Sequence, residues 1–193
     1  MSSQPRARLT PLEYLTLDRQ AEHKSEYYGG EVFAMAGGSE RHNLIVGNAF
    51  AGIHAQFRKR PCRVYASDMR VKVSPAGMYA YPDVMAVCGE VRFDDEQRDT
   101  LLNPSVIVEV LSESTEGYDR GKKFESYRRL DSLVEYVLIA QDAHRVEHYV
   151  RQTDNRWLMS EYVSLQDTLS FPSLSVQLSL ADIYDKVEAD RAA

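Results

Sequence analysis

The chain has 193 residues, a formal net charge of −6, and 44% hydrophobic against 27% charged residues. This length suits one domain with a sizeable core, and the composition is that of an ordinary globular protein. The acidic balance argues against a protein that coats nucleic acid through bulk electrostatics, because phosphate binding needs clustered Lys and Arg. No long apolar run and no signal-like N-terminal segment is present, so we expect a cytoplasmic protein that does not enter membranes.

The first third of the chain predicts a helix, a hairpin and a second helix. Residues 10–13, "TPLE", combine a capping Thr, a Pro in the first turn and a Glu three positions after the cap. Residues 26–38, "EYYGGEVFAMAGG", contain two short strand-like runs joined by Gly-Gly, which is typical of a hairpin. Ser39 can cap a long amphipathic helix over residues 40–57.

The rest of the chain predicts mostly strands, with one helix over residues 118–130 and a short closing helix. The strand candidates are residues 62–67, 69–74, 79–88, 105–112, 134–141, 144–152, 156–163 and the start of 173–187. This order of elements predicts an α+β (mixed α/β) fold with a central mixed sheet flanked by helices. We expect a single domain with an ordered core over about residues 10–187 and flexible ends.

One acid lies inside the apolar run "VIVEVL", residues 106–111. With the period of a strand, three valines fall on one face, while Ile107, Glu109 and Leu111 fall on the other. Neither face is polar. A carboxylate in such surroundings is costly unless it is paired, hydrogen-bonded or bound to a metal.

A second acid, Asp83 in "YPDVMAV", shares a predicted strand face with apolar residues. If the two strands are neighbours, the carboxylates of Asp83 and Glu109 can lie on the order of 5 Å apart. Two such anions need compensation, and a hard cation such as Mg²⁺, or Mn²⁺ in its place, supplies it through oxygen ligands.

The helix after Glu109 offers two adjacent lysines. Lys123 lies on the stripe with Tyr127 and Leu130 that faces the sheet, whereas Lys122 points to solvent. Lys123 is therefore the better candidate to reach the carboxylates. Lys122, Arg120, Arg128 and Arg129 would form a flanking basic surface for nucleic acid, although a charge run of this kind is also typical of a solvated helix face.

Three motifs together resemble the PD-(D/E)XK nuclease superfamily: "PD" at 82–83, "EVL" at 109–111 and "DRGKKFESY" at 119–127. With "GGEVFAMAGGSERHN" at 29–43 and "VEYVLI" at 134–139, the chain is similar more narrowly to the Uma-type branch of restriction-endonuclease-like proteins, over about residues 10–185. The resemblance implies a restriction-endonuclease-like core and a Mg²⁺-dependent endonuclease acting on DNA. It places the metal on Asp83, Glu109 and the backbone carbonyl of Val110, with Lys123 assisting the attacking water.

The resemblance also extends to further residues and to assembly. The superfamily often adds an acid from its N-terminal part, for which Glu31 is a candidate. His42, in the first turn of the predicted long helix, could also reach the site, although a His at a helix start is more often a structural hydrogen-bonding group. Many nucleases of this fold are homodimers, because cutting both strands needs two sites.

The sequence departs from the superfamily pattern at one position. Leu111 stands two residues after the acid, where the usual lysine is expected, and in the Uma-type branch the lysine has moved to the following helix, at Lys123. A catalytically inactive nuclease fold that serves as a binding or assembly module is the alternative reading. Each acid could instead have a purely structural role. Asp83 could be a turn residue at the start of a strand, and Glu109 could form a buried ion pair with a structural Lys or Arg.

The remaining candidates have simpler interpretations. Cys62 and Cys88 lack metal-ligand spacing, so we expect buried free thiols and a reducing compartment. His144 and His148 alternate as in a strand, so we expect both on an exposed sheet face. Asp68 is expected in a turn.

Overall fold

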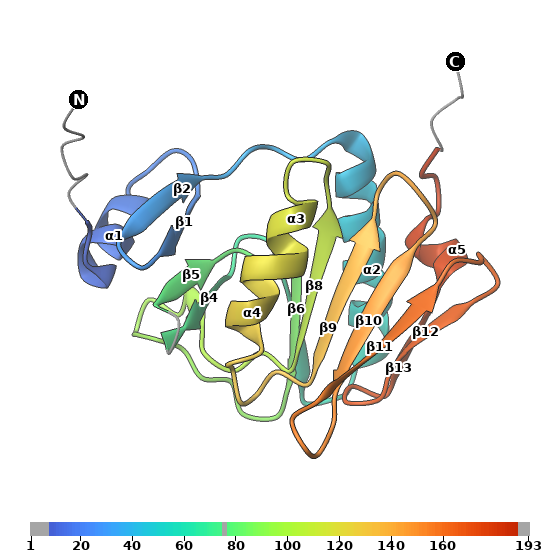
Figure 1. The fold of residues 1–193 in the computed structure, drawn as a ribbon. Helices are drawn as coiled ribbons and strands as arrows, with labels where there is room; N and C mark the ends of the chain where they lie inside the picture. Colours follow the sequence, from blue (N-terminus) through green and yellow to red (C-terminus); the bar gives the residue numbers. More distant parts are fainter. Residues whose placement is uncertain (1–7, 75–76, 189–193) are drawn as a thin grey trace.

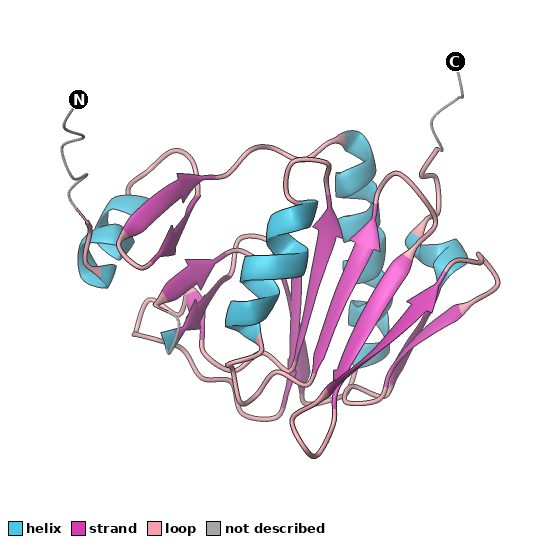
Figure 2. Ribbon diagram, in the orientation of Figure 1, coloured by secondary structure: helices cyan, strands magenta, loops and turns pink. Residues whose placement is uncertain are grey.

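The computed structural model describes residues 8–74 and 77–188, and most of the predicted flexible ends lie outside these ranges. The protein has a large mixed sheet with helices on both faces, a smaller sheet beside it and a two-stranded sheet near the C-terminus (Figure 1). Figure 2 shows that strands predominate, as the sequence predicts for an α+β fold. In the described ranges, no helix is long and apolar enough to span a membrane.

The large sheet has six strands. Its strand order is β11 (Trp157–Tyr162), β10 (Val146–Arg151), β9 (Glu135–Ala140), β8 (Val106–Leu111), β6 (Val84–Cys88) and β3 (Cys62–Ala66). Only β8 and β9 run parallel, and the other neighbours are antiparallel. Asp83 directly precedes β6 and Glu109 lies within β8, and these two strands are neighbours in one sheet.

The smaller sheets surround this central one. The five-stranded sheet has the order β2 (Glu31–Ala34), β1 (Ser25–Tyr28), β5 (Met78–Ala80), β4 (Arg70–Val73) and β7 (Thr100–Leu101). The two-stranded sheet pairs β12 (Thr168–Phe171) with β13 (Val176–Ser179). The helices are α1 (Pro11–Asp18), α2 (Glu40–Phe57), α3 (Glu116–Tyr118), the π-helical segment η2 (Asp119–Lys123), α4 (Phe124–Tyr127) and α5 (Leu180–Ile183).

The predicted N-terminal elements are confirmed together with their caps. Thr10 and Glu13 form a capping box at the start of α1, and Ser39 Oγ accepts the His42 N–H at 3.1 Å at the start of α2. Between β1 and β2, Gly29 and Gly30 have φ values of 57° and 100°, which a hairpin turn requires and glycine adopts without strain.

The predicted strand over residues 79–88 is wrong, because the chain forms two strands there. β5 ends at Ala80 in the small sheet and β6 begins at Val84 in the large one. Pro82 has no N–H to donate to a ladder, so pairing stops in the crossing segment. Asp83 lies in this segment, directly before β6.

The predicted helix over residues 118–130 is also divided. Helical structure begins at Glu116 and ends at Tyr127, and its middle turn, η2, is π-helical. Gly121 lies inside this turn, and the wider turn adds one residue relative to an α-helix. π-helical turns of this kind are frequent at functional sites.

The two faces of β8 are buried as predicted. Val106, Val108 and Val110 belong to the core cluster that includes α2, whereas Ile107 and Leu111 belong to the opposite cluster. Figure 1 shows α2 behind the large sheet, with α3 and α4 in front of it. Glu109 therefore points to the side covered by α3, η2 and α4.

The prediction of two exposed histidines is wrong for His148. Its Nε2 lies 2.6 Å from Oε2 of Glu135, and both side chains are buried. The end of β12 and the residues after it cover this pair, since the Phe171 ring contacts the imidazole and the Ser173 N–H donates to the other Glu135 oxygen. His144 is exposed, as predicted, but it lies in the bend before β10 and not in the sheet.

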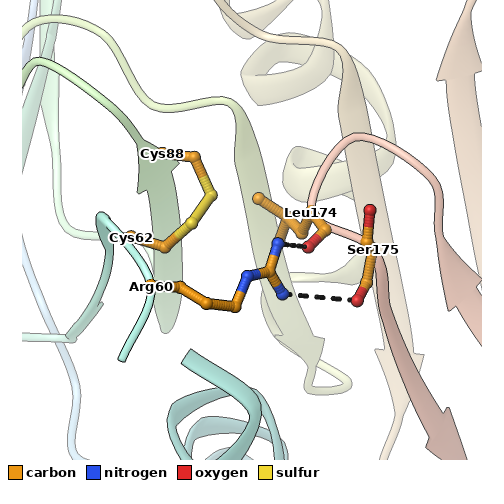
Figure 3. Close-up of a disulfide and its surroundings, with 5 residues drawn as sticks. All are labelled: Arg60, Cys62, Cys88, Leu174 and Ser175. Carbon is orange, nitrogen blue, oxygen red and sulfur yellow. Dashed lines mark hydrogen bonds between the residues drawn. A yellow bond between two sulfur atoms is a disulfide. The ribbon is translucent and has the colours of Figure 1, made fainter. Parts of the chain in front are cut away.

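The prediction of two free thiols is also wrong, because Cys62 and Cys88 form a disulfide (Figure 3). They lie directly opposite each other in the antiparallel pair β3–β6, with their Cα atoms 4.0 Å apart. The inference of a reducing compartment rested on the free thiols and loses its basis. Nearby, the Arg60 guanidinium donates hydrogen bonds to the carbonyls of Leu174 and Ser175 (Figure 3). Arg60 therefore ties the end of α2 to the turn between β12 and β13.

Candidate active site

Lys123 lies at the centre of three buried carboxylates. Its Nζ is 3.1 Å from Oε1 of Glu26, 3.1 Å from Oε1 of Glu109 and 3.2 Å from Oδ1 of Asp119. The exposed fractions of the four side chains are 9% for Lys123, 8% for Glu26, 4% for Glu109 and 3% for Asp119. We call these four residues the lysine cluster. The Tyr127 hydroxyl donates to Oε1 of Glu109 at 2.9 Å and completes its surroundings.

The four members of the lysine cluster come from three parts of the fold. Glu26 comes from β1 in the five-stranded sheet, and Glu109 comes from β8 in the six-stranded sheet. Asp119 and Lys123 are the first and last residues of η2, four positions apart. Lys123 therefore joins the two sheets through its ammonium group.

Asp83 and His42 lie on the other side of Glu109 along β8. Oδ2 of Asp83 accepts the N–H of Val110 at 2.7 Å, and Oδ1 lies 3.0 Å from Nε2 of His42 in the first turn of α2. These two side chains are 14% and 20% exposed. The Asp83 carboxylate is thus tied to the residue that directly follows Glu109.

The negative charge of the site perturbs the buried groups. Burial raises the pKa of Glu109 well above its usual value, and the charges of Asp119, Asp83 and Glu26 act in the same direction, while Lys123 opposes them. Burial alone would lower the pKa of Lys123, but Glu109, Glu26 and Asp119 raise it well above its usual value. The ammonium is therefore charged at neutral pH, in a region with more acids than bases.

The imidazole of His42 is perturbed by the same surroundings. Burial lowers its pKa, but the hydrogen bond and charge of Asp83, with a backbone contact to Val110, more than offset this and raise it. His42 thus contacts two of the three groups that the sequence predicts as metal ligands.

A cavity of about 590 Å³ opens beside these residues, between the N-terminus of α2 and the carboxyl ends of β8 and β9. Its lining includes Arg41, next to His42, and Leu111 and Ser112, which follow Val110. Asp83, His42, Glu109 and Lys123 do not themselves line this cavity, which adjoins them only through their neighbours in the chain.

Comparison with known proteins decides the family. The model of the Uma2 family, described as "Putative restriction endonuclease", matches residues 11–182. The chain belongs to the Uma2 family. The resemblance read from the sequence motifs is thereby confirmed.

Two proteins of a cyanobacterium are similar to this chain over most of their length. It is 38% identical over 168 residues to sll1609, an uncharacterized protein of Synechocystis sp., covering 87% of this chain and 95% of that protein. It is 31% identical over 182 residues to slr1290, another uncharacterized protein of the same organism, covering 94% of each.

The fold is similar to a crystal structure from Anabaena variabilis, titled a putative nuclease belonging to DUF820. The TM-score is 0.75 at 18% sequence identity, covering 93% of this chain and 99% of that one. At this identity the likeness shows the fold alone, and it confirms the predicted restriction-endonuclease-like α+β architecture.

The structure brings most of the residues proposed from the sequence of this Uma2 protein into contact. Lys123 reaches Glu109 at 3.1 Å, Asp83 holds the Val110 N–H, and His42 holds Asp83. Glu31 is not brought in, because it is exposed on β2 at the edge of the small sheet.

The four residues of the predicted basic surface differ in their availability, and Arg129 forms an ion pair with Glu125 at 3.3 Å. Lys122 is exposed, with its Nζ 4.6 Å from the centre of the Tyr28 ring, and Arg128 is exposed as well. Arg120 instead forms ion pairs with Glu116, at 2.8 Å, and with Glu147. Lys122 and Arg128 are therefore better placed than Arg120 for contact with a phosphate.

Sequence reasoning missed Glu26 and Asp119. A signal for Asp119 existed, because it lies four residues before Lys123 and the helical stripe that selected Lys123 extends back to it. Glu26 alternates with the buried Tyr27 in a strand of four residues, and its contact with Lys123 depends on how two sheets meet. No local pattern encodes that contact.

The donor set fits a hard divalent cation. Asp83, Glu109 and the Val110 carbonyl offer only oxygen ligands, which Mg²⁺ and Mn²⁺ prefer. The excess of carboxylates and the buried Oδ1 of Asp119, which makes no hydrogen bond within residues 8–74 and 77–188, indicate that the site can accept more positive charge. Over the same described ranges, no three His, Cys, Asp or Glu side chains form a metal-binding group, so side chains would have to move for a cation to bind there.

Proposed function

We propose that this Uma2 protein is a metal-dependent endonuclease that hydrolyses phosphodiester bonds of DNA. The observation that supports the proposal best is the buried contact between Lys123 and Glu109 beside the Asp83–Val110 hydrogen bond. Family membership supports the nuclease class, while the metal, the DNA substrate and the role of each residue are proposals.

In this proposal Asp83, Glu109 and the Val110 carbonyl hold Mg²⁺, and Mn²⁺ can replace it. When bound, the cation supplies Lewis acidity toward the phosphate and toward a water molecule. Lys123 directs ammonium protons toward the attacking water or toward the phosphate, where negative charge develops in the transition state. The Tyr127 hydroxyl holds Oε1 of Glu109, so this carboxylate keeps one orientation.

The proposed DNA contacts lie on the surface next to Lys123. Lys122 and Arg128 would contact phosphates, and Arg120 would join them only by exchanging Glu116 or Glu147 for a phosphate. Because the net charge is −6, binding should depend on this local basic surface and weaken steeply with salt. Cleavage of both strands would require two copies of the site, so we propose a homodimer.

The test is nicking of supercoiled and single-stranded DNA with Mg²⁺ or Mn²⁺. Wild type should nick, and Asp83→Ala and Glu109→Ala should lose activity by roughly 100-fold or more, as expected when a group that acts in the transition state is removed. Glu31→Ala is the matched control, because it removes an exposed acid and should leave nicking unchanged.

Two outcomes contradict the proposal. Nicking that persists equally in Asp83→Ala and Glu109→Ala means that another site, or a contaminant, cuts the DNA. A folded wild-type protein that neither nicks DNA nor binds Mn²⁺ in calorimetry supports the inactive binding or assembly module instead.

A further inference from the structure

Glu26 and Asp119 have no part in the proposed chemistry, yet they bury two carboxylates against Lys123. The distances are 3.1 Å and 3.2 Å, equal within 0.1 Å to the 3.1 Å contact between Lys123 and Glu109. An ammonium group has three protons, and here each proton has one carboxylate within reach. The contact with Glu109 is a hydrogen bond, and the contacts with Glu26 and Asp119 are ion pairs, so three acids together hold the ammonium group.

A structural ion pair alone does not explain the two additional acids. One lysine can offset the charge of one carboxylate, and burying further carboxylates is costly. Within the described residues, Oδ1 of Asp119 makes no hydrogen bond, so its contact with Lys123 is an ion pair that no hydrogen bond supplements. The presence of these two buried acids is explained if they hold the Lys123 ammonium group in place.

Both acids are themselves fixed from outside the cluster. Oε1 of Glu26 accepts the N–H of Tyr81 at 3.4 Å, two residues before Asp83, so Glu26 also contacts the segment that carries the predicted metal ligand. The main-chain carbonyl of Asp119 accepts the Tyr136 hydroxyl at 3.0 Å, which ties the π-helical turn to β9. Glu26 and Asp119 can therefore transmit the positions of two sheets to one ammonium group.

We propose that Glu26 and Asp119 are positioning residues that hold the Lys123 ammonium beside Glu109, Glu26 from the small sheet and Asp119 from the π-helical turn. This inference rests on the proposed function in one respect, that Lys123 acts on the water or phosphate. When a cation takes over Glu109, the other two acids keep Lys123 within the site. They act through Lys123 and do not touch the substrate.

The first test does not depend on nuclease activity. Lysine side-chain ¹⁵N NMR detects ammonium groups whose protons are protected from exchange, and Lys123→Met assigns the signal. We expect a protected Lys123 signal in the wild type, its loss or strong broadening in Glu26→Gln and Asp119→Asn, and no change in Glu125→Gln. Glu125 is the matched control, because it lies on the neighbouring helix and is 56% exposed. Absence of the signal in the wild type, or its persistence in both variants, overturns the proposal.

The second test uses steady-state nicking. Glu26→Gln and Asp119→Asn should lower kcat by about 10- to 100-fold, the cost of misplacing a catalytic group, and change KM by less than about twofold. Glu26→Asp, which keeps the charge on a shorter side chain, should recover part of the loss.

A double-variant comparison separates positioning from direct action. In the Lys123→Met background, Glu26→Gln should lower kcat no further, because both changes remove the same interaction. Additive losses would mean that Glu26 acts independently of Lys123 and would refute the positioning role. If the wild type does not cleave DNA, the proposed function fails, and the NMR result alone decides whether these acids hold Lys123.

Discussion

Replacement of Lys123 by Met should destabilise the protein in a manner that depends on pH. The change keeps an unbranched side chain but leaves three buried carboxylates without their shared cation. Removing one partner of a buried ion pair costs roughly 3–5 kcal/mol of the free energy of unfolding. The exposed neighbour offers a matched control: Lys122→Met removes only the contact with the Tyr28 ring and should change stability by less than about 1 kcal/mol.

The sign of the pH dependence follows from Glu109. Its folded-state pKa is already raised by burial, and Lys123 is the charge that opposes this rise. Without Lys123 the pKa rises further. An acid whose pKa is higher in the folded state than in the unfolded state stabilises the fold fully only at a pH below its unfolded-state pKa, about 4.3 for Glu. This stabilisation is lost as the pH rises through the folded-state pKa. The deficit of Lys123→Met should therefore be smaller at about pH 5 than at about pH 8, because more of Glu109 is protonated at the lower pH.

Urea unfolding, monitored by tryptophan fluorescence, can measure the loss of stability in Lys123→Met at each pH. The single Trp, Trp157, contacts Phe124 with ring centres 5.3 Å apart, so its emission should report on the helix that follows Lys123. Unfolding is compared at about pH 5 and about pH 8 for wild type, Lys123→Met and Lys122→Met. Equal stability of the two variants at both pH values would refute the account of a buried, charge-dependent lysine cluster.

Three further changes test the surrounding fold. Glu135→Ala leaves the buried His148 unpaired and should cost about 3–5 kcal/mol in urea unfolding, whereas a loss below about 1 kcal/mol would show that the pair is not buried in solution. Cys62→Ser removes the bond to Cys88 and should cost roughly 2–4 kcal/mol under non-reducing conditions, and an unchanged midpoint, or free thiols by mass spectrometry, would contradict the disulfide. Thr10→Ala removes the α1 capping box and should cost about 1 kcal/mol in denaturant unfolding, a value that Thr10→Ser should largely restore.

Local patterns predicted the elements and part of the site. The capping box at Thr10, the Gly-Gly hairpin and the alternation along residues 106–111 depend on neighbours in the chain, and all three are confirmed. Helical spacing also placed Lys123 on the inner face of its helix. A short-range geometry of this kind can be read from one sequence, because the side chains that interact lie within a few residues of each other.

Contacts between distant segments could not be predicted in this way. Glu26 meets Lys123 because two sheets adjoin, and Cys62 faces Cys88 because β3 and β6 pair in one particular register. His148 is buried by the end of β12 and the residues after it, 20 or more residues later in the chain. In each case the burial or the partner depends on tertiary packing, which periodicity does not specify.

The most direct test of the central claim is the position of a bound cation. In crystals soaked with Mn²⁺, anomalous scattering should place one ion within coordination distance of the carboxylates of Asp83 and Glu109 and of the Val110 carbonyl, at roughly 2.0–2.3 Å for oxygen ligands. The same peak should be absent from crystals of Glu109→Ala. An ion bound elsewhere, or no ion at this position at millimolar Mn²⁺, would contradict the proposed metal-dependent nuclease site.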